Sequence, residues 1–243
     1  DLAKYCLGTV GLLDKCTFRF SQWDPANPKN KYEGTKEQWD HAQSVMAKIL
    51  DDLGVKYDIG IDEAAFYGPK LDIQYKNVYG KEDTLVTIQI DMLLAERFGM
   101  YYTDENGEKK LPYIIHRTSL GCYERTLAYL IEHYAGALPT WMAPEQVRFL
   151  PVTDRAVDYC KEQAAKLTAQ GYRVTVDTRS EKIGKKIRDA QMEKIPYMLV
   201  VGDRDIEAGT VSPRHRADGD LGAMTLDAFT AVLKDVVDNK LQK

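Results

Sequence analysis

Leu71-Asp72-Ile73-Gln74-Tyr75 and Thr87-Ile88-Gln89-Ile90-Asp91 are the two stretches that decide the fold of the first half of this chain. In both, apolar and polar residues alternate, which is typical of strands with one buried and one polar face. Asn106-Gly107, a hairpin signal, lies between residues 100–103 and a further apolar run at 111–116. Because these strands follow one another without a long helix between them, we expect an antiparallel sheet and an α+β fold.

Two helices are expected beside this sheet. Thr35 and Gln38 fit a capping box, after which Trp39, Ala42, Met46, Ile49 and Leu53 recur at helical spacing and are expected to point inward. The second helix is expected over residues 123–134. Its predicted buried stripe consists of Leu127, Leu130, Ile131 and Tyr134.

Residues 136–144 contain two prolines and a glycine, which indicates a connector between domains. We therefore place one domain at 1–144 and a second at 145–243. In the second domain, strand patterns at 147–152, 172–176 and 197–201 alternate with helix patterns, and Ser180 is expected to cap one of these helices. This alternation predicts an α/β domain with a mixed sheet.

Composition excludes several classes of protein. The 243 residues are 44% hydrophobic and 29% charged, as in folded globular proteins, and no run of about 18 apolar residues indicates a membrane span. The net charge of −4 argues against a general nucleic-acid binder. The four cysteines are scattered and form no C-x-x-C pair, so a reducing, cytoplasmic location is expected.

Two polar groupings are candidates for a site on the sheet. The turn at Gly68-Pro69 holds Tyr67 and Lys70 at one end of a strand. The strand at 87–91 presents Thr87, Gln89 and Asp91 on one face, which suits a polar ligand. The same residues also fit a plain hairpin turn and a solvent-facing side of an antiparallel sheet.

A third grouping runs from His116 to Arg125, where a strand ends and a helix begins. Gly121 permits close approach of the backbone, and Arg125 lies in the first helical turn. An arginine at a helix N-terminus can hold a phosphate or stack on a purine. His116 could bind a metal or be an ordinary histidine at the end of a strand.

Five segments in this order resemble the C-terminal half of the bacterial threonyl-tRNA synthetases, which are class II aminoacyl-tRNA synthetases. They are Phe66–Lys70, Thr87–Asp91, His116-Arg117, Gly121–Arg125 and Pro139–Pro144. The resemblance implies the end of an antiparallel class II catalytic domain followed by an anticodon-binding domain. It covers nearly the whole chain.

The resemblance also implies roles for individual residues. Arg125 and Lys70 would be catalytic, and Arg125 and Gly121 would bind ATP together with Mg²⁺. The pocket for threonine would be lined by Tyr67, Thr87, Gln89 and Cys122. His116 would be one of three ligands of a zinc ion that grips the amino and hydroxyl groups of threonine.

Some positions depart from the family pattern. The other two zinc ligands of the family lie upstream of the matching region, as do motif 1, which forms the homodimer, and motif 2, which binds the α-phosphate. We therefore expect a truncated piece that is weak or inactive alone. Asp83–Val86 stands where Trp-Gln-Cys-Gly is common, and Cys122 replaces a frequent serine.

In the second domain, Ser180, Lys182, Asp205 and Arg214 match positions that read the anticodon of the tRNA for threonine. Asp205 stands where Glu is common and Ser180 where Asn is common. A basic cluster lies around Ser180 and Lys182, and a cluster of this kind can bind phosphates. It consists of Arg179, Lys182, Lys185, Lys186 and Arg188.

The resemblance therefore implies a threonine–tRNA ligase that acts on threonine, ATP and tRNA, and the composition predicts no membrane partner. Two other functions stay open. The chain could be a non-catalytic tRNA- or RNA-binding module that uses only residues 145–243. It could also be a stand-alone paralogue that binds ATP or an amino acid without tRNA.

Overall fold

The structure is a computed structural model, and it describes residues 1–27 and 31–242. The chain divides into two compact units, Asp1–His133 and Tyr134–Lys243. Among the described residues, no helix is both long enough and apolar enough to cross a lipid bilayer.

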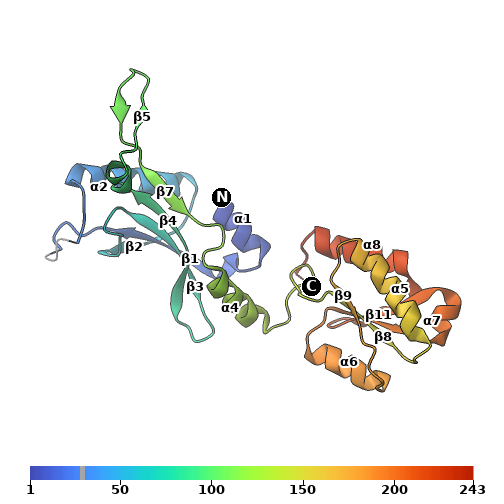
Figure 1. Ribbon diagram of the computed structural model, residues 1–243. Coiled ribbons are helices and arrows are strands. Elements are labelled where there is room, and N and C mark those ends of the chain that lie inside the picture. Colours follow the sequence, from blue (N-terminus) through green and yellow to red (C-terminus); the bar gives the residue numbers. More distant parts are fainter. Residues whose placement is uncertain (28–30, 243) are drawn as a thin grey trace. The chain divides into compact units, whose positions relative to one another are not determined.

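The first unit is a five-stranded sheet with helices (Figure 1). Its elements in chain order are α1 (Leu2–Thr9), η1 (Leu13–Lys15), β1 (Cys16–Gln22), α2 (Lys36–Asp52), β2 (Asp58–Ile61), β3 (Lys70–Lys76), β4 (Glu82–Asp91), α3 (Leu94–Arg97), β5 (Tyr102–Thr103), β6 (Lys109–Lys110), β7 (Ile114–Arg117) and α4 (Tyr123–Tyr134). The strand order is β2-β1-β3-β4-β7. Every pairing is antiparallel, as the alternation predicts, except that edge strand β2 runs parallel to β1.

Helix α2 covers one face of this sheet. Its capping box at Thr35 is confirmed, since the Thr35 side chain accepts from the Gln38 N–H and the Gln38 side chain accepts from the Thr35 N–H. Phe20, Leu71 and Ile90 of the sheet pack against Ala42, Met46 and Leu50 of the helix. The expected inward positions Ile49 and Leu53 are wrong, because Leu50 takes the place in the core and both of these side chains are about half exposed.

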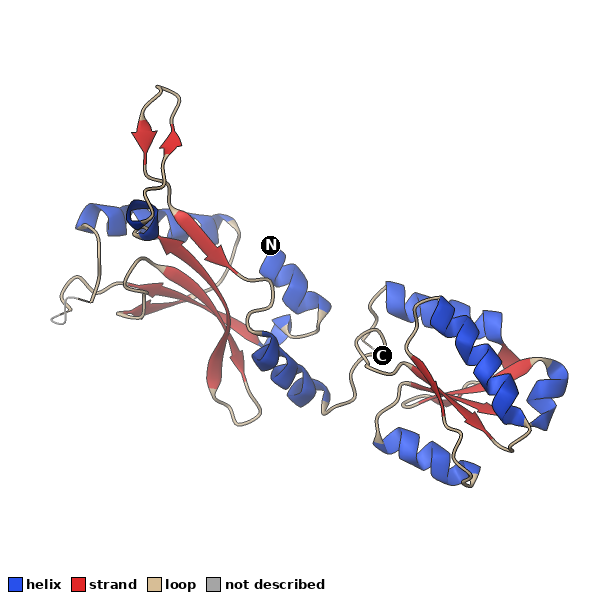
Figure 2. Cartoon of the chain, in the orientation of Figure 1, coloured by secondary structure: helices blue, strands red, loops and turns tan. Residues whose placement is uncertain are grey.

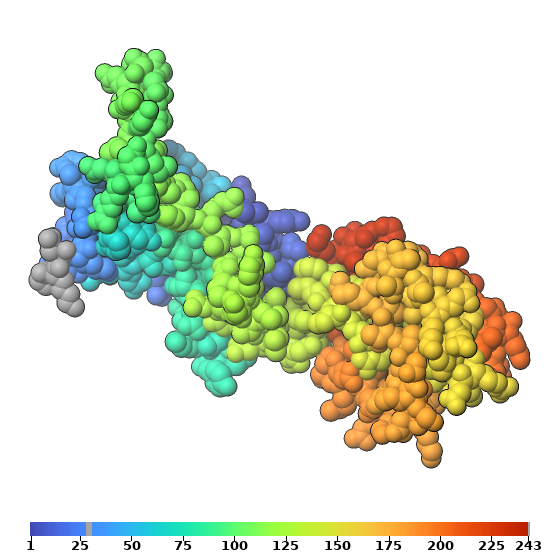
Figure 3. Space-filling view, viewed as in Figure 1, coloured from blue at the N-terminus to red at the C-terminus, as the bar shows by residue number. Residues whose placement is uncertain are grey.

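Strands β5 and β6 form a separate two-stranded hairpin that stands out from the rest of the unit (Figures 1 and 3). Its turn contains Gly107 with a positive φ of 83°. The run at 111–116 was expected to be the second strand of this hairpin. Instead Lys109–Lys110 pairs with Tyr102–Thr103, and Ile114–Arg117 joins β4 of the main sheet.

The buried face of α4 differs from the predicted stripe. Thr126 and Tyr129 are buried, whereas Leu127 and Ile131 are about half exposed. Thr126 and Tyr129 face inward because both make hydrogen bonds there. The Thr126 hydroxyl donates to the Leu120 carbonyl, and the Tyr129 hydroxyl donates to Asp83 Oδ2 over 2.8 Å. The prediction is therefore wrong for Leu127 and Ile131, whereas Leu130 and Tyr134 of the same stripe are partly buried.

The second unit is a mixed sheet with helices on both faces (Figure 2). Its elements are β8 (Val147–Pro151), α5 (Ala156–Ala169), β9 (Val174–Val176), α6 (Ile183–Met192), β10 (Tyr197–Val201), α7 (Asp203–Ala208), β11 (Thr210–His215), β12 (Gly219–Asp220), β13 (Met224–Thr225) and α8 (Leu226–Asp238). Strands β8, β9 and β10 are parallel, and β11 is antiparallel to β10. Helices α5 and α8 share the larger core with the sheet, and α6 packs on the smaller one. This is the predicted α/β domain.

The connector belongs to the second unit, although the sequence suggested a boundary after residue 144. Arg216 Nη2 donates to the carbonyls of Ala137 and Leu138 over 2.8 and 2.6 Å. Arg173 donates in the same way to the carbonyls of Trp141 and Ala143. Two guanidinium groups thus fasten an otherwise irregular segment to the sheet domain.

Candidate functional site

The register of three strands brings the predicted site residues together. Lys70 of β3 lies opposite Gln89 of β4, and Gln89 lies opposite His116 of β7. Directly opposite side chains share a face of a sheet, and here it is the face away from α2. Lys70, Gln89 and His116 therefore line one pocket of about 860 Å³, with Arg125 from α4 at its border.

Tyr67 reaches this row from the turn before β3. Its hydroxyl donates to Gln89 Oε1 over 2.7 Å, and its ring centroid lies 6.0 Å from that of His116. Burial, followed by the charge of Asp91, raises the pKa of Tyr67, so the phenol stays a donor at neutral pH. The turn is held tightly, since a Cβ on Gly68 would lie 1.8 Å from the Ile90 carbonyl oxygen.

His116 is paired with a fully buried carboxylate. Its Nε2 lies 2.8 Å from Asp91 Oδ2, while Asp91 Oδ1 accepts from the backbone N–H groups of Leu93 and Leu94. Burial is the largest influence on Asp91 and acts to raise its pKa. The hydrogen bonds from Leu94, His116 and Leu93 outweigh it, and the pKa lies below its ordinary value.

The donor set around His116 does not fit a zinc site by itself. Protein zinc sites use three or four side-chain ligands. Within residues 1–27 and 31–242, no three histidine, cysteine or carboxylate side chains come close enough to share a metal ion. The predicted role of His116 as a zinc ligand therefore stays a prediction.

The loop before α4 carries the candidates for binding ATP. Gly121 has a φ of 80°, and a Cβ there would lie 1.9 Å from the Leu85 carbonyl oxygen, so only glycine fits. Arg125 Nη1 donates to the Thr84 carbonyl over 2.7 Å and borders the pocket. The Cys122 thiol is exposed at the same border and donates to Glu124 Oε2 over 3.0 Å.

Sequence reasoning missed Asp72, the most connected residue of the pocket. Its carboxylate is 3% exposed and accepts hydrogen bonds from Lys70, Thr87 and Ser21. Alternation had placed Asp72 on the polar face. The signal that would have singled it out is the cross-strand register, which puts it directly opposite Thr87.

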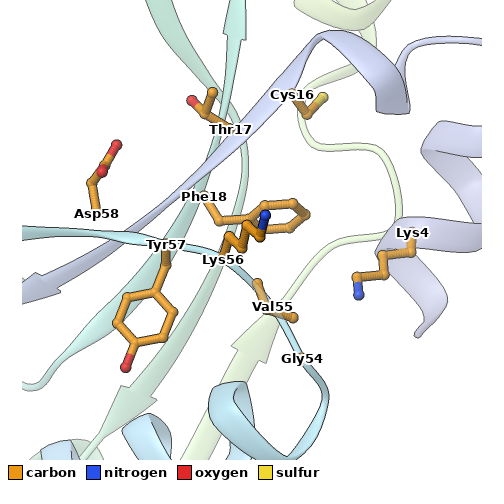
Figure 4. A pocket seen from close by; sticks show the side chains of 9 residues that line it. All are labelled: Lys4, Cys16, Thr17, Phe18, Gly54, Val55, Lys56, Tyr57 and Asp58. Atoms are coloured by element: carbon orange, nitrogen blue, oxygen red, sulfur yellow. The ribbon is translucent and has the colours of Figure 1, made fainter.

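Another pocket of the first unit, of about 440 Å³, contains none of the predicted site residues (Figure 4). Lys4, Lys56 and Phe18 are among the side chains that line it. Its Cys16 thiol donates to the Leu12 carbonyl, and burial raises the pKa of this thiol to about 11, which makes it a poor nucleophile. We therefore take the pocket around Gln89 as the candidate site of the first unit.

In the second unit, Ser180 and Lys182 line a pocket of about 650 Å³ near the end of β8. Ser180 does not cap α6, contrary to the expectation, because the helix begins after Lys182 and no side chain caps it.

The predicted basic cluster around this pocket is largely neutralised by its own neighbours. Arg179 pairs with Asp177 and Asp189 at 2.7 and 2.9 Å, and Lys185 pairs with Glu181. Lys186 is buried and donates to the carbonyls of Pro151 and Asp177. The positive charge that remains available is smaller than the sequence indicates.

Asp205 and Arg214 do not line that pocket. Asp205 is bound internally, because its Oδ2 accepts from the Gly202 N–H and its Oδ1 accepts from the Ser212 hydroxyl, each within 3.0 Å. Arg214 pairs with Asp220 at 3.3 Å, and its buried Nε has no acceptor among the described residues. Arg214 thus has donor capacity to spare, whereas Asp205 has little.

Comparisons with known proteins agree with this layout. Residues 22–134 match the family model of the tRNA synthetase class II core domain (G, H, P, S and T), and residues 146–236 match that of the anticodon binding domain. A threonine–tRNA ligase of Clostridium perfringens is 57% identical over 94% of this chain and 36% of its own length. One of Clostridium botulinum is 52% identical over 99% of the chain and 37% of its own length.

A solved structure shows the same fold. The RNA binding domain of threonyl-tRNA synthetase from Cryptosporidium parvum superposes with a TM-score of 0.87 at 31% identity, over 97% of this chain and 58% of that one. The chain spans about a third of the length of the curated relatives it matches. It belongs to the threonyl-tRNA synthetase family, and it comprises the end of the class II core followed by the anticodon-binding domain.

Proposed function

We propose that this chain takes part in threonine–tRNA ligation by carrying part of the ATP and threonine site together with the domain that reads tRNA. In this reaction the threonine carboxylate attacks the α-phosphorus of ATP and releases pyrophosphate. A ribose hydroxyl at the end of the tRNA then attacks the carbonyl of the adenylate. The observation that carries the proposal is the row Lys70, Gln89 and His116, which lines one pocket with Arg125 and is joined to Tyr67 by the hydrogen bond to Gln89.

Threonine would bind against Tyr67, Thr87 and Gln89. The Tyr67 hydroxyl fixes Gln89, and the Gln89 amide and Thr87 hydroxyl offer the donors and acceptors that a small polar amino acid needs. A site that pairs with the substrate hydroxyl rejects the isosteric valine, because valine would leave buried polar groups unpaired. Cys122 would border the amino acid at the mouth of the pocket.

ATP would lie toward Lys70, Gly121 and Arg125. The ammonium and guanidinium groups favour the charge that develops during phosphoryl transfer, and Mg²⁺ bound to ATP would offset the remainder. Gly121 holds the loop before α4 against the Leu85 carbonyl at the border of this pocket. No step depends on zinc. In the described residues, His116 instead orients Asp91 and contacts the Tyr67 ring.

The chain by itself is expected to be weak in adenylate formation. The positive side chains that line the pocket in the described residues are Lys70, Arg117 and Arg125. The expectation rests on the family resemblance, which places the arginine that contacts the α-phosphate upstream of the matching region. Homodimer formation and a cytoplasmic location also stay predictions.

The second unit would read the anticodon of the tRNA for threonine. Arg214 supports this role best, since its side chain is 31% exposed and its guanidinium, which pairs with Asp220 at 3.3 Å, can donate to a base edge. Ser180 and Lys182 would contribute from the pocket near the end of β8. Asp205 would act mainly by holding Gly202 and Ser212 in place.

Two measurements test the proposal. The first is binding of ATP and of threonine to the purified chain by calorimetry, with valine and serine as comparators. The second is binding of tRNA with a threonine anticodon, compared with the same tRNA carrying a changed anticodon. We expect both sites to bind, with a preference for threonine and for the threonine anticodon, and pyrophosphate exchange to be slow.

The outcomes separate the alternatives. Binding of tRNA without ATP or threonine would support the RNA-binding module. Binding of threonine or ATP without tRNA would support the paralogue. Failure of all three ligands to bind would refute the proposed function, and rapid exchange would refute the expectation of weak activity.

A further inference from the structure

Asp72 is a buried negative charge within the candidate site. Its Oδ2 accepts from Lys70 Nζ over 2.7 Å and from the Ser21 hydroxyl over 2.9 Å, and its Oδ1 accepts from the Thr87 hydroxyl over 2.8 Å. The three donors come from β1, β3 and β4, so one carboxylate ties three adjacent strands together. An isolated buried carboxylate would be very costly, and Lys70 supplies the cation that offsets it.

These contacts leave little of the carboxylate for a ligand. Three donors occupy the two oxygens, and the side chain is 3% exposed. Lys70, in contrast, is 22% exposed and lines the pocket. An ammonium has three donors, so after one has bound Asp72, two remain for a ligand. Asp72 is thus suited to act through Lys70 rather than on the substrate itself.

We propose that Asp72 is a positioning residue that fixes the Lys70 ammonium, and with it the Thr87 hydroxyl, at the floor of the nucleotide and amino-acid pocket. This inference rests on the proposed function for its catalytic meaning, because Lys70 is taken to face ATP. A lysine side chain has four rotatable bonds, and an ammonium held before the ligand arrives loses less freedom on binding. The carboxylate therefore raises affinity for ATP without touching it.

The first test needs no ligand. Lys70 acetylation by acetic anhydride is measured by mass spectrometry relative to Lys76, an exposed lysine at the other end of the same strand. In Asp72→Asn we expect the ratio to rise about tenfold, the lower end of what a hydrogen bond to a charged group contributes. Asp83→Asn is the matched control, since Asp83 accepts from Tyr129 and does not line the pocket.

An unchanged ratio in Asp72→Asn would overturn the proposal. If this variant does not fold, Ser21→Ala and Thr87→Val replace it, because each removes one hydrogen bond that holds the carboxylate. A loosened carboxylate should raise the Lys70 ratio in both variants. If neither variant changes the ratio, the proposal fails.

The second test is a double-mutant cycle on ATP affinity. We expect Asp72→Asn and Lys70→Met each to weaken ATP binding about tenfold, and the double variant to be no weaker than Lys70→Met alone. Additive losses would show that Asp72 acts independently of Lys70, and would overturn the proposal. If the unaltered chain binds no ATP, the proposed role of this pocket in ATP binding fails, while the acetylation ratio still decides whether Asp72 holds Lys70.

Discussion

The Tyr67 hydroxyl donates to Gln89 Oε1 over 2.7 Å, which joins a turn residue to the central strand of the candidate site. This bond holds the carbonyl end of the Gln89 side chain. Gln89 can therefore meet a ligand in one defined orientation.

Replacing Tyr67 by phenylalanine removes this donor and keeps the ring. We expect the free energy of unfolding to fall by about 1 kcal/mol and threonine affinity to fall about tenfold, because the amide is no longer held. Calorimetric titration measures the affinity. Tyr57→Phe is the control, since its hydroxyl bonds Asp51 outside this pocket. Equal losses in both variants would count against a role for Tyr67.

Replacing Gly121 by alanine should disrupt the site by sterics. Its Cβ would lie 1.9 Å from the Leu85 carbonyl oxygen, so β4 and the start of α4 must separate. We expect a loss of about 3 kcal/mol or more in chemical denaturation. Gly107→Ala is the matched control: its φ of 83° is similar but its Cβ meets nothing, so the loss should be about 1 kcal/mol. Similar losses in the two variants would refute the close approach.

Asp91 should make the first unit sensitive to acid. Its pKa is lower in the folded chain than the ordinary value, so its contribution to stability is complete above the unfolded pKa. This contribution is lost as the pH falls through the folded pKa. Unfolding followed between pH 7 and pH 2 should show a shallower acid loss in Asp91→Asn than in the unaltered chain. Asp14→Asn, at an exposed site, should leave the acid dependence unchanged.

Arg214 should distinguish the tRNA site from the nucleotide site. We expect Arg214→Ala to weaken binding of tRNA about tenfold at fixed salt and to leave ATP affinity unchanged. Arg155→Ala is the control, because Arg155 is exposed on the same unit and pairs with Asp203. Equal weakening of tRNA binding by both variants would indicate a general charge effect and refute specific contact by Arg214.

Strand alternation was enough to predict the sheet and the polar face that carries Thr87 and Gln89. It could not identify Asp72 as a buried hub, because burial of a polar residue depends on which donors lie across the strands. Its donors Ser21 and Thr87 become its neighbours only when the register is known. The convergence of Lys70, Gln89 and His116 follows from that same register.

Helix positions were predicted better than the faces they bury. The α4 bounds match the expected range, yet Thr126 and Tyr129 face inward in place of Leu127 and Ile131. Hydrophobic periodicity measures where apolar residues gather. It does not register that Tyr129 gains a buried hydrogen bond with Asp83 and a ring contact with Tyr75.

Arg173 and Arg216, which bind residues 137–143, limit where a folded fragment of the second unit can begin. A fragment that starts at residue 145 would retain Arg173 and Arg216 but lose four of the five carbonyl acceptors of these guanidinium groups, and only the Lys194 carbonyl, bound by Arg216, would remain. The Arg173 guanidinium would then keep neither of its two carbonyl acceptors, and Arg216 would keep one of three. The minimal autonomous form of the second unit therefore starts upstream of β8, because residues 137–143 are part of its structure.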